Sequence, residues 1–352
     1  MKRFIPKFIS ILCANRPQQH LFLLLPLLMS FAACQPSLPE AKPLDEPPVL
    51  FPDYMGVTVP CNIAPLNFRL EGAHPTIARL MAGKEELRIA ASDGSLSIPQ
   101  SSWEHLLQAA KGDQLQVELY AEREEGWVRY APFAIHVAKE PIDPYLVYRK
   151  IAPGYRMWNR MGIYQRNLTN FEEEAFLDNK QTNNNCMNCH SFCQRDPSKM
   201  LFHQRMTHAG TYVIRDGEIE KLDTKTNHTI SALVYPYWHP SGRYVAFSTN
   251  DTKQDFHMSD LNRVEVFDHR SDVVVYDVEH HRVLTSPLLS SDDHLETFPS
   301  FSPDGRTLYF CSADSVTLPE QYNKVRYNLL SLSFDPEKGV FGTQIDTLYH
   351  AN

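Results

Sequence analysis

The sequence predicts an all-β protein in which a β-sandwich is followed by propeller blades. Alternation of apolar and polar residues, as in Gln114-Leu115-Gln116-Val117-Glu118-Leu119, indicates half-buried strands. An internal repeat supports the second half of the prediction: residues 235–247 match residues 298–310 at an offset of 63. Both copies run from an aromatic residue and a proline into a tight turn, Pro240-Ser241-Gly242 or Pro303-Asp304-Gly305.

Residues 52–140 are expected to form the first domain. Short alternating strands separated by turns such as Ser92-Asp93-Gly94 favour an immunoglobulin-like sandwich of antiparallel strands. One helix, Trp103–Ala110, interrupts the series. The domain shows no catalytic constellation, so a spacer or binding role is expected. The expected strands are Leu66–Leu70, Ile77–Met81, Glu86–Ala90, Gln114–Tyr120 and Trp127–Val137.

Residues 209–352 are expected to form incomplete propeller blades. The two repeats each continue into an outer pair of strands, which gives four strands per unit. An earlier hairpin turns at Asp216-Gly217 and resembles part of another blade. A closed propeller needs about four to eight blades, whereas this segment provides about two and a half. We therefore expect either a truncated sequence, which we favour, or an open sheet edge that another copy of the chain covers. The outer strands are Val273–Tyr276 with Val283–Thr285 and Leu329–Phe334 with Thr343–Thr347, and the early hairpin is Thr211–Ile214 with Ile219–Leu222.

Residues 1–34 have the pattern of a lipoprotein signal peptide. Lys2, Arg3 and Lys7 precede a mostly apolar run, which ends in Phe31-Ala32-Ala33-Cys34. This ending resembles a bacterial lipobox and predicts cleavage before Cys34 and lipidation of its thiol. Gln35 follows, with no aspartate to retain the protein at the inner membrane. We expect a bacterial cell-envelope protein, anchored in the outer membrane, with residues 35–51 as a proline-rich tether.

The segment 141–208 connects the two β domains and contains the motif Cys186-Met187-Asn188-Cys189-His190. C-x-x-C-H is the spacing of covalent c-type haem attachment. The two thiols form thioethers with the porphyrin, and the adjacent imidazole becomes the proximal iron ligand. The sequence therefore predicts one haem c, held by Cys186 and Cys189 with His190 on the iron. Export out of the cytoplasm agrees with this prediction.

The sixth iron ligand is expected within a short stretch after the motif. The residue types that ligate haem c there are methionine and histidine. His203 is our first choice because it follows Met200, Leu201 and Phe202, which are able to line a pocket, and Met200 is the alternative. Met206 and His208 complete the set, and a five-coordinate iron is also open.

A metal or redox dithiol is the rival interpretation of the motif. Cys193 lies four residues after Cys189, so Cys186, Cys189, His190 and Cys193 together form a possible compact zinc site. No second ligand pair is visible in the sequence, although structural zinc sites usually combine two. Cys61, Cys193 and Cys311 remain as an odd set in the mature protein, either as one disulfide with one buried thiol or as three buried thiols.

Composition narrows the function classes. A net charge of −8 argues against nucleic acid as a partner. The sequence contains no G-x-S-x-G, H-E-x-x-H or P-loop pattern, so catalysis is not the expected function and no catalytic residue is assigned. Two interpretations remain: a lipid-anchored haem protein for electron transfer or ligand sensing, whose propeller docks a protein partner, or a protein- or glycan-binding scaffold whose C-x-x-C-H segment binds zinc or forms a disulfide.

The turns Trp238-His239-Pro240-Ser241-Gly242 and Phe301-Ser302-Pro303-Asp304-Gly305 resemble TolB-like propeller repeats of bacterial envelope proteins. The order of lipobox, β domain, C-x-x-C-H segment and blades is similar to a group of Bacteroidota lipoproteins, often labelled cytochrome c biosynthesis proteins. Ala64-Pro65-Leu66-Asn67-Phe68 and residues 158–166 share in this resemblance, which covers most of the mature chain. The resemblance implies an envelope propeller with a haem motif, and it implies no specific activity.

Overall fold

A computed structural model describes residues 35–351, apart from residues 73–74, 152–160, 260 and 262–263. The chain divides into two compact units, one of which ends at Tyr148 and also takes in Tyr164–Phe176, while the other contains Arg149–Ile163 and Leu177–Asn352. Within the residues described, no helix is both long and apolar enough to span a bilayer.

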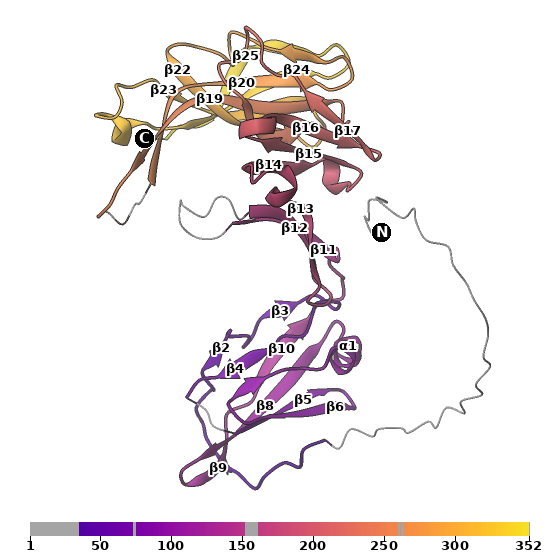
Figure 1. Ribbon diagram of the computed structural model, residues 1–352. Helices are drawn as coiled ribbons and strands as arrows, with labels where there is room; N and C mark the ends of the chain where they lie inside the picture. Colours follow the sequence, from indigo (N-terminus) through magenta and orange to yellow (C-terminus); the bar gives the residue numbers. More distant parts are fainter. Residues whose placement is uncertain (1–34, 73–74, 152–160, 260, 262–263, 352) are drawn as a thin grey trace, which may run out of the picture. The chain divides into compact units, whose positions relative to one another are not determined.

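The first unit contains two β-sheets and one helix (Figure 1). A seven-stranded sheet has the order β1-β9-β8-β10-β3, with β5 paired to β8 and β6 paired to β5, and β2, β4 and β7 form a second sheet. The elements are β1 (Lys42–Pro43), β2 (Leu50–Phe51), β3 (Thr58–Val59), β4 (Phe68–Leu70), β5 (Thr76–Ala82), β6 (Glu85–Ala91), β7 (Ser95–Leu96), α1 (Gln100–Ala109), β8 (Gln114–Arg123), β9 (Gly126–Arg129) and β10 (Phe133–Val137).

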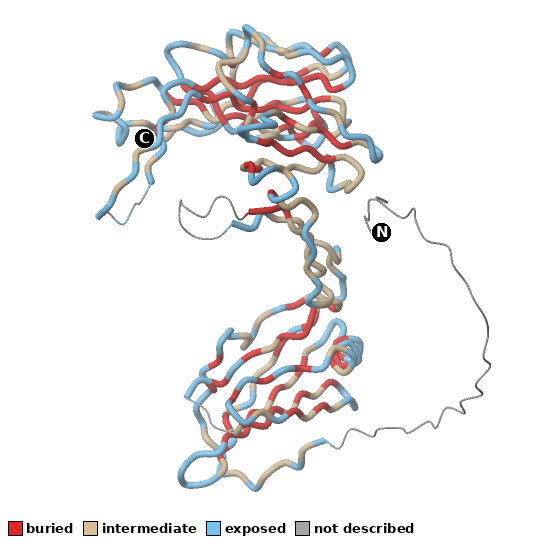
Figure 2. Tube along the Cα trace, viewed as in Figure 1, coloured by how far each residue is buried: buried red, intermediate tan, exposed pale blue. Residues whose placement is uncertain are grey.

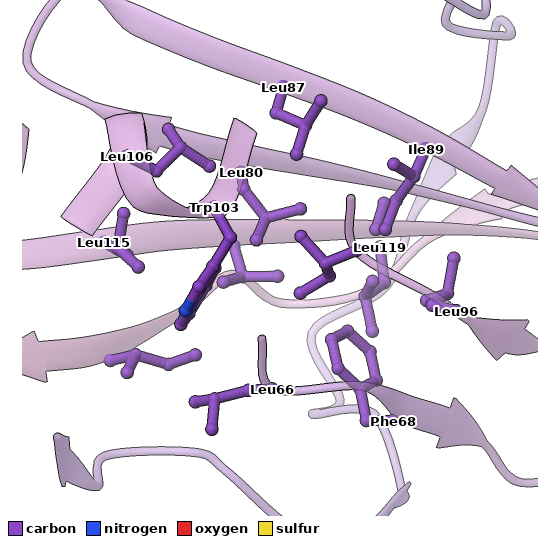
Figure 3. Close-up of a cluster of buried hydrophobic side chains, with 14 of the residues drawn as sticks. Leu66, Phe68, Leu80, Leu87, Ile89, Leu96, Trp103, Leu106, Leu115 and Leu119 are labelled. Carbon is purple, nitrogen blue, oxygen red and sulfur yellow. The ribbon is translucent and has the colours of Figure 1, made fainter. Parts of the chain in front are cut away.

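One hydrophobic core joins the two sheets and the helix. Trp103 of α1 is fully buried, and its indole Nε1–H donates to the carbonyl of Ile63 at 2.9 Å. Leu80 and Leu119, from neighbouring strands of the large sheet, surround the indole, while Phe68 comes from the small sheet (Figure 3). The alternation noted around Gln114 therefore buries every second side chain of β8 in this core.

The first unit differs in two respects from the expected antiparallel sandwich. The strand expected over Trp127–Val137 is divided into β9 and β10, which both pair with β8. The large sheet is also mixed, because β1 runs parallel to β9 and β3 runs parallel to β10. Lys42–Pro43, in the segment expected to be a tether, thus adds a short strand to the sheet.

A three-stranded sheet of order β11-β12-β13 follows along the chain. It contains β11 (Tyr145–Ile151), β12 (Met161–Asn167) and β13 (Glu173–Asp178), and a 3-10 turn, η1 (Asn179–Thr182), leads out of it.

Three four-stranded antiparallel sheets form the propeller blades of the second unit (Figure 1). The first two strands of blade 1 come from residues 141–208, the segment expected to be a connector, so this part of the chain has three blades rather than two and a half. Blade 1 consists of β14 (Met187–Phe192), η2 (Cys193–Arg195), β15 (Lys199–Gln204), η3 (Met206–His208), β16 (Gly210–Arg215) and β17 (Glu218–Leu222). Blade 2 consists of β18 (Leu233–Trp238), β19 (Tyr244–Phe256), β20 (Val264–Asp277) and β21 (Arg282–Leu284), and blade 3 of β22 (His294–Phe301), β23 (Thr307–Asp314), η4 (Tyr322–Lys324), β24 (Asn328–Asp335) and β25 (Val340–Tyr349).

Blade 2 packs against blade 1 on one face and against blade 3 on the other, and both faces are apolar. Val245 and Phe247 of β19 pack in the core shared with blade 1, whereas Tyr244 and Ala246 pack in the core shared with blade 3. Figure 2 shows the resulting runs of buried residues along the middle strands. A continuous apolar strand such as Tyr244–Phe247 is what burial on both faces requires.

Candidate functional site

The C-x-x-C-H motif lies at the start of β14, the first strand of blade 1. The backbone N–H of Arg205 donates to the carbonyl of Cys186 at 2.8 Å, which joins the motif to the end of β15. Asn188 pairs with His203 and Ser191 pairs with Leu201, so Cys189 and His190 together face the single residue between these partners. This is a β-bulge, and Cys189 adopts the left-handed conformation there, with φ of 53°.

The same bulge recurs in the first strand of each blade. Tyr235 in β18 has φ of 50° and Phe298 in β22 has φ of 52°, and in both strands the register shifts at this point. Pro236 and Pro299 follow these residues, as His190 follows Cys189. The left-handed residue is therefore a feature of the blade architecture, and the motif places its second thiol at that position in blade 1.

The equivalent residues of blades 2 and 3 form an aromatic pair. The ring centroids of Tyr235 and Phe298 are 4.6 Å apart with an interplanar angle of 54°. Their side chains are 46% and 50% exposed, respectively, so the pair is open to a ligand on one side. Burial raises the pKa of Tyr235, as do the nearby Asp268 and Cys189, which keeps the phenol neutral.

The thiols of the motif are unpaired and partly exposed in this structure. None of the described cysteines forms a disulfide, and Cys186 and Cys189 are both half-buried, which leaves them accessible. His190 is also half-buried, and its ring lies edge-on to that of Phe192, with centroids 6.3 Å apart. Two accessible thiols and an accessible imidazole are the donor set that covalent haem attachment uses.

His203 and Met200, the two candidates for the sixth iron ligand, lie on opposite faces of β15. Both are buried, with exposures of 4% and 0%. Met200 pairs with Phe192 and His203 pairs with Asn188, and strand alternation turns their side chains to opposite sides. Only one of them is therefore able to serve a group bound on a given face of blade 1. Met206 is exposed with φ of 67°, and His208 is exposed at the end of η3.

The imidazole of His203 is neutral at physiological pH. Burial, together with the charge of Arg205, lowers the pKa of His203 to about 4. Its Nδ1 lies 3.3 Å from the hydroxyl of Thr211, and the ring borders a cavity of about 750 Å³ that Gly210, Lys221, Asp223 and Ser231 also line. A neutral imidazole is the form that binds a metal ion.

A structural role also explains the position of His203. Ser248 occupies the equivalent position in blade 2, where it pairs with Val234, the residue just before the bulge of the first strand. The Ser248 hydroxyl accepts the backbone N–H of Phe298 at 2.9 Å and so joins blade 2 to blade 3. His203 occupies the corresponding position in blade 1, where its ring lies beside the Thr211 hydroxyl of the neighbouring strand.

Cys193 belongs to the core between blades rather than to the surface of the motif. It is 4% exposed and packs with Leu201 and Trp238, and its Sγ contacts the carbonyl of His239 at 3.8 Å. Burial raises the pKa of this thiol, which opposes the thiolate form that zinc requires. Among the residues described, no three histidine, cysteine, aspartate or glutamate side chains are placed to hold a metal ion.

Sequence reasoning missed two features of this region. It did not connect Tyr235 and Phe298 with Cys189, although residues 189–193 align with residues 235–239 at an offset of 46. It also missed Glu296, a carboxyl group that is only 4% exposed in β22. Burial and the nearby Asp272 raise the pKa of Glu296 to about 7. Cys34, the expected lipidation site, lies outside the described residues.

Comparison with known proteins gives distant structural similarities to β-propeller proteins. No family model matches the sequence, and no curated protein matches it. An oligogalacturonate lyase from Vibrio parahaemolyticus is 12% identical with a TM-score of 0.32, over 59% of this chain and 51% of that one. A puromycin-hydrolyzing peptidase from Mycobacterium tuberculosis is 12% identical with a TM-score of 0.34, over 68% and 38%. A putative dipeptidyl aminopeptidase IV from Bacteroides ovatus is 13% identical with a TM-score of 0.30, over 66% and 35%. The match spans 51% of the lyase, 38% of the puromycin-hydrolyzing peptidase and 35% of the aminopeptidase, so it covers about half or less of each of these proteins.

Proposed function

We propose that this chain is a c-type haem protein of the bacterial cell envelope. One haem c is held by thioether bonds from Cys186 and Cys189, with His190 as the axial iron ligand. The observation that carries the proposal is the C-x-x-C-H spacing, found in a strand where neither thiol forms a disulfide and both are half-buried. When bound, the haem supplies a one-electron redox centre, so we propose electron transfer or ligand sensing as the activity.

The residues around the motif support this proposal by their chemistry. The side chain next to the second thiol is an imidazole that is only half-buried, so it is accessible to an iron ion. His203 is neutral and lies in the strand paired with the motif, which suits it to the sixth position, and Met200 suits the opposite face. Both are uncharged and buried, so whichever of them bound the iron would do so from a site largely shielded from water.

The cellular context is also a proposal. We propose that the chain is an outer-membrane lipoprotein anchored through Cys34, as the signal sequence and the resemblance to the Bacteroidota lipoprotein group suggest. Its propeller is proposed to dock a protein partner, and the net charge of −8 disfavours nucleic acid in that role.

The test is production of the full chain with a c-type haem maturation system, followed by a visible spectrum and haem staining of a denaturing gel. We expect a sharp reduced α-band and a stain that survives denaturation, because thioether bonds resist it. Cys186→Ala with Cys189→Ala should remove the stain, whereas Cys311→Ala, a cysteine elsewhere in the propeller, should retain it. A colourless wild-type protein, with zinc or without any metal, would refute the proposal and leave the alternative of a binding scaffold.

A further inference from the structure

Three equivalent positions lie on neighbouring first strands of the blades, and only one of them is a cysteine. Hydrogen bonds join the neighbouring blades here: the indole N–H of Trp238 in β18 donates to the carbonyl of Ser191 in β14 at 3.2 Å, and the backbone N–H of Phe298 in β22 donates to the Ser248 hydroxyl of β19 at 2.9 Å. These bonds connect β18 to β14 and β22 to blade 2. Cys189, Tyr235 and Phe298 are therefore held as neighbours by the backbone of the blades.

The backbone holds the exposed aromatic pair, Tyr235 and Phe298, in a fixed position. Both residues occupy a bulge with positive φ, and each is followed by a proline, which fixes the next backbone angle. The two rings contact each other at 4.6 Å, yet about half of each remains open to solvent. A rigid aromatic surface that is already exposed loses little conformational entropy when a flat apolar ligand covers it.

A porphyrin bonded to Cys189 is the flat ligand that would lie close to this aromatic pair. A thioether would join the sulfur to the porphyrin through the single carbon left from a vinyl group, so a porphyrin attached there would lie next to Cys189. The strands that carry Cys189 and Tyr235, β14 and β18, lie side by side, and the bond from Trp238 to Ser191 holds them together. Burial also favours the neutral form of the phenol, which suits contact with an apolar macrocycle.

We infer that Tyr235 and Phe298 form the surface against which the porphyrin attached at Cys189 packs. The inference rests on the proposed function and adds to it the residues of blades 2 and 3 that position the group. Tyr235 and Phe298 are positioning residues in this arrangement. The haem then touches all three blades, although its covalent bonds and axial histidine come from blade 1.

The experiment uses the haem-loaded full chain, with the double variant Tyr235→Ala and Phe298→Ala. Covalent haem stain should be unchanged, because the thiols are intact. Circular dichroism in the Soret region, which reports aromatic side chains near the porphyrin, should fall about twofold or more. Bleaching of the haem by peroxide should accelerate about threefold or more, and the midpoint potential should decrease, because solvent reaches the group.

Two further variants separate this role from general damage to the propeller. Tyr349→Ala removes an exposed aromatic ring from the outermost strand of blade 3 and should leave all three signals unchanged. Tyr235→Phe keeps the ring and should behave like the wild type. If the wild type stains for haem while the double variant keeps its Soret signal, bleaching rate and potential, the inference is wrong and the proposed function survives. If the wild type carries no haem, both fail.

Discussion

Glu296 provides a test of the physical reasoning that does not depend on haem. Its carboxyl group is 4% exposed, and burial, with the charge of Asp272 second, raises its pKa from 4.5 to about 7. A carboxyl group whose folded-state pKa is raised contributes stability that is complete below about pH 4.5 and is lost as the pH rises to about 7. A shift of this size corresponds to about 3 kcal/mol of unfolding free energy.

The perturbation is Glu296→Gln, which keeps the shape and does not ionise. At pH 4.5 the variant and the wild type should unfold with free energies within about 1 kcal/mol, because Glu296 is protonated in both states. Between pH 4.5 and pH 8, the unfolding free energy of the variant minus that of the wild type should rise by about 3 kcal/mol. Subtracting the two chains at each pH removes the contributions of titrating groups that do not interact with Glu296, such as His203, and leaves those of Glu296 and of its coupling to Asp272.

Urea unfolding followed by tryptophan fluorescence at several pH values between 4.5 and 8 gives this difference. Glu320→Gln is the matched control, because the same chemical change at an exposed carboxylate should give a difference that does not vary with pH. A flat difference for Glu296→Gln would show that the carboxylate is adequately solvated or paired in the folded protein, and the argument from burial would be refuted.

Three further predictions concern packing. Gly305→Ala places a Cβ 2.0 Å from His239 Nε2, whereas the Cβ of Gly217→Ala, also at positive φ, meets nothing within 4 Å. Gly305→Ala should therefore lower the unfolding free energy by about 1–3 kcal/mol more than Gly217→Ala. Equal losses in urea unfolding would exclude a steric role for His239. Trp103→Ala should cost about 3–5 kcal/mol, because it removes a fully buried ring from the first-unit core, and a loss under 1 kcal/mol by the same assay would contradict that burial. Cys193→Ala should keep the haem stain and lose about 1 kcal/mol of stability; loss of the bound cofactor or metal would instead favour the compact zinc site.

The sequence identified blades 2 and 3 because their turns carry strong local signals. Pro240, Gly242, Pro303 and Gly305 fix backbone angles within a few residues, so a tight turn between two alternating strands is legible without any tertiary information. Both glycines have positive φ in the structure, as those turns require. The antiparallel strands around them then follow from short connections.

The first two strands of blade 1 could not be predicted from the sequence because they lack the local signals of the other blades. Blade 1 has Cys189-His190 where blades 2 and 3 have an aromatic residue and a proline, so its repeat loses the residues that make the others recognisable. Its turn is also one residue longer: Phe192 pairs with Met200, whereas Trp238 pairs with Val245. The offset of 63 that relates blades 2 and 3 does not extend to blade 1, so its first two strands were expected to be part of a connector.

The mixed sheet of the first unit shows a second limit. Its parallel pairs join residues far apart in the chain, Lys42 with Val128 and Thr58 with His136, through strands of only two residues. Such short strands have no periodicity to detect, and their partners are chosen by the whole domain rather than by local propensity. The contact between Tyr235 and Phe298 was hidden in the same way, because it depends on the order of the blades.

The repeated bulge changes how the C-x-x-C-H motif is to be understood. A non-glycine residue with positive φ is uncommon, and at Cys189 alone it would suggest backbone strain stored for chemistry. Tyr235 and Phe298 share this conformation and have no reactive side chain, so the bulge belongs to the blades themselves. The unusual feature of blade 1 is therefore the side chains placed on a common backbone. Two thiols and an imidazole stand in blade 1 where the other blades have apolar or aromatic residues and a proline. Substitutions at Cys186, Cys189 and His190 should accordingly alter cofactor binding while leaving the blade folded, since the backbone conformation persists with entirely different residues in the neighbouring blades.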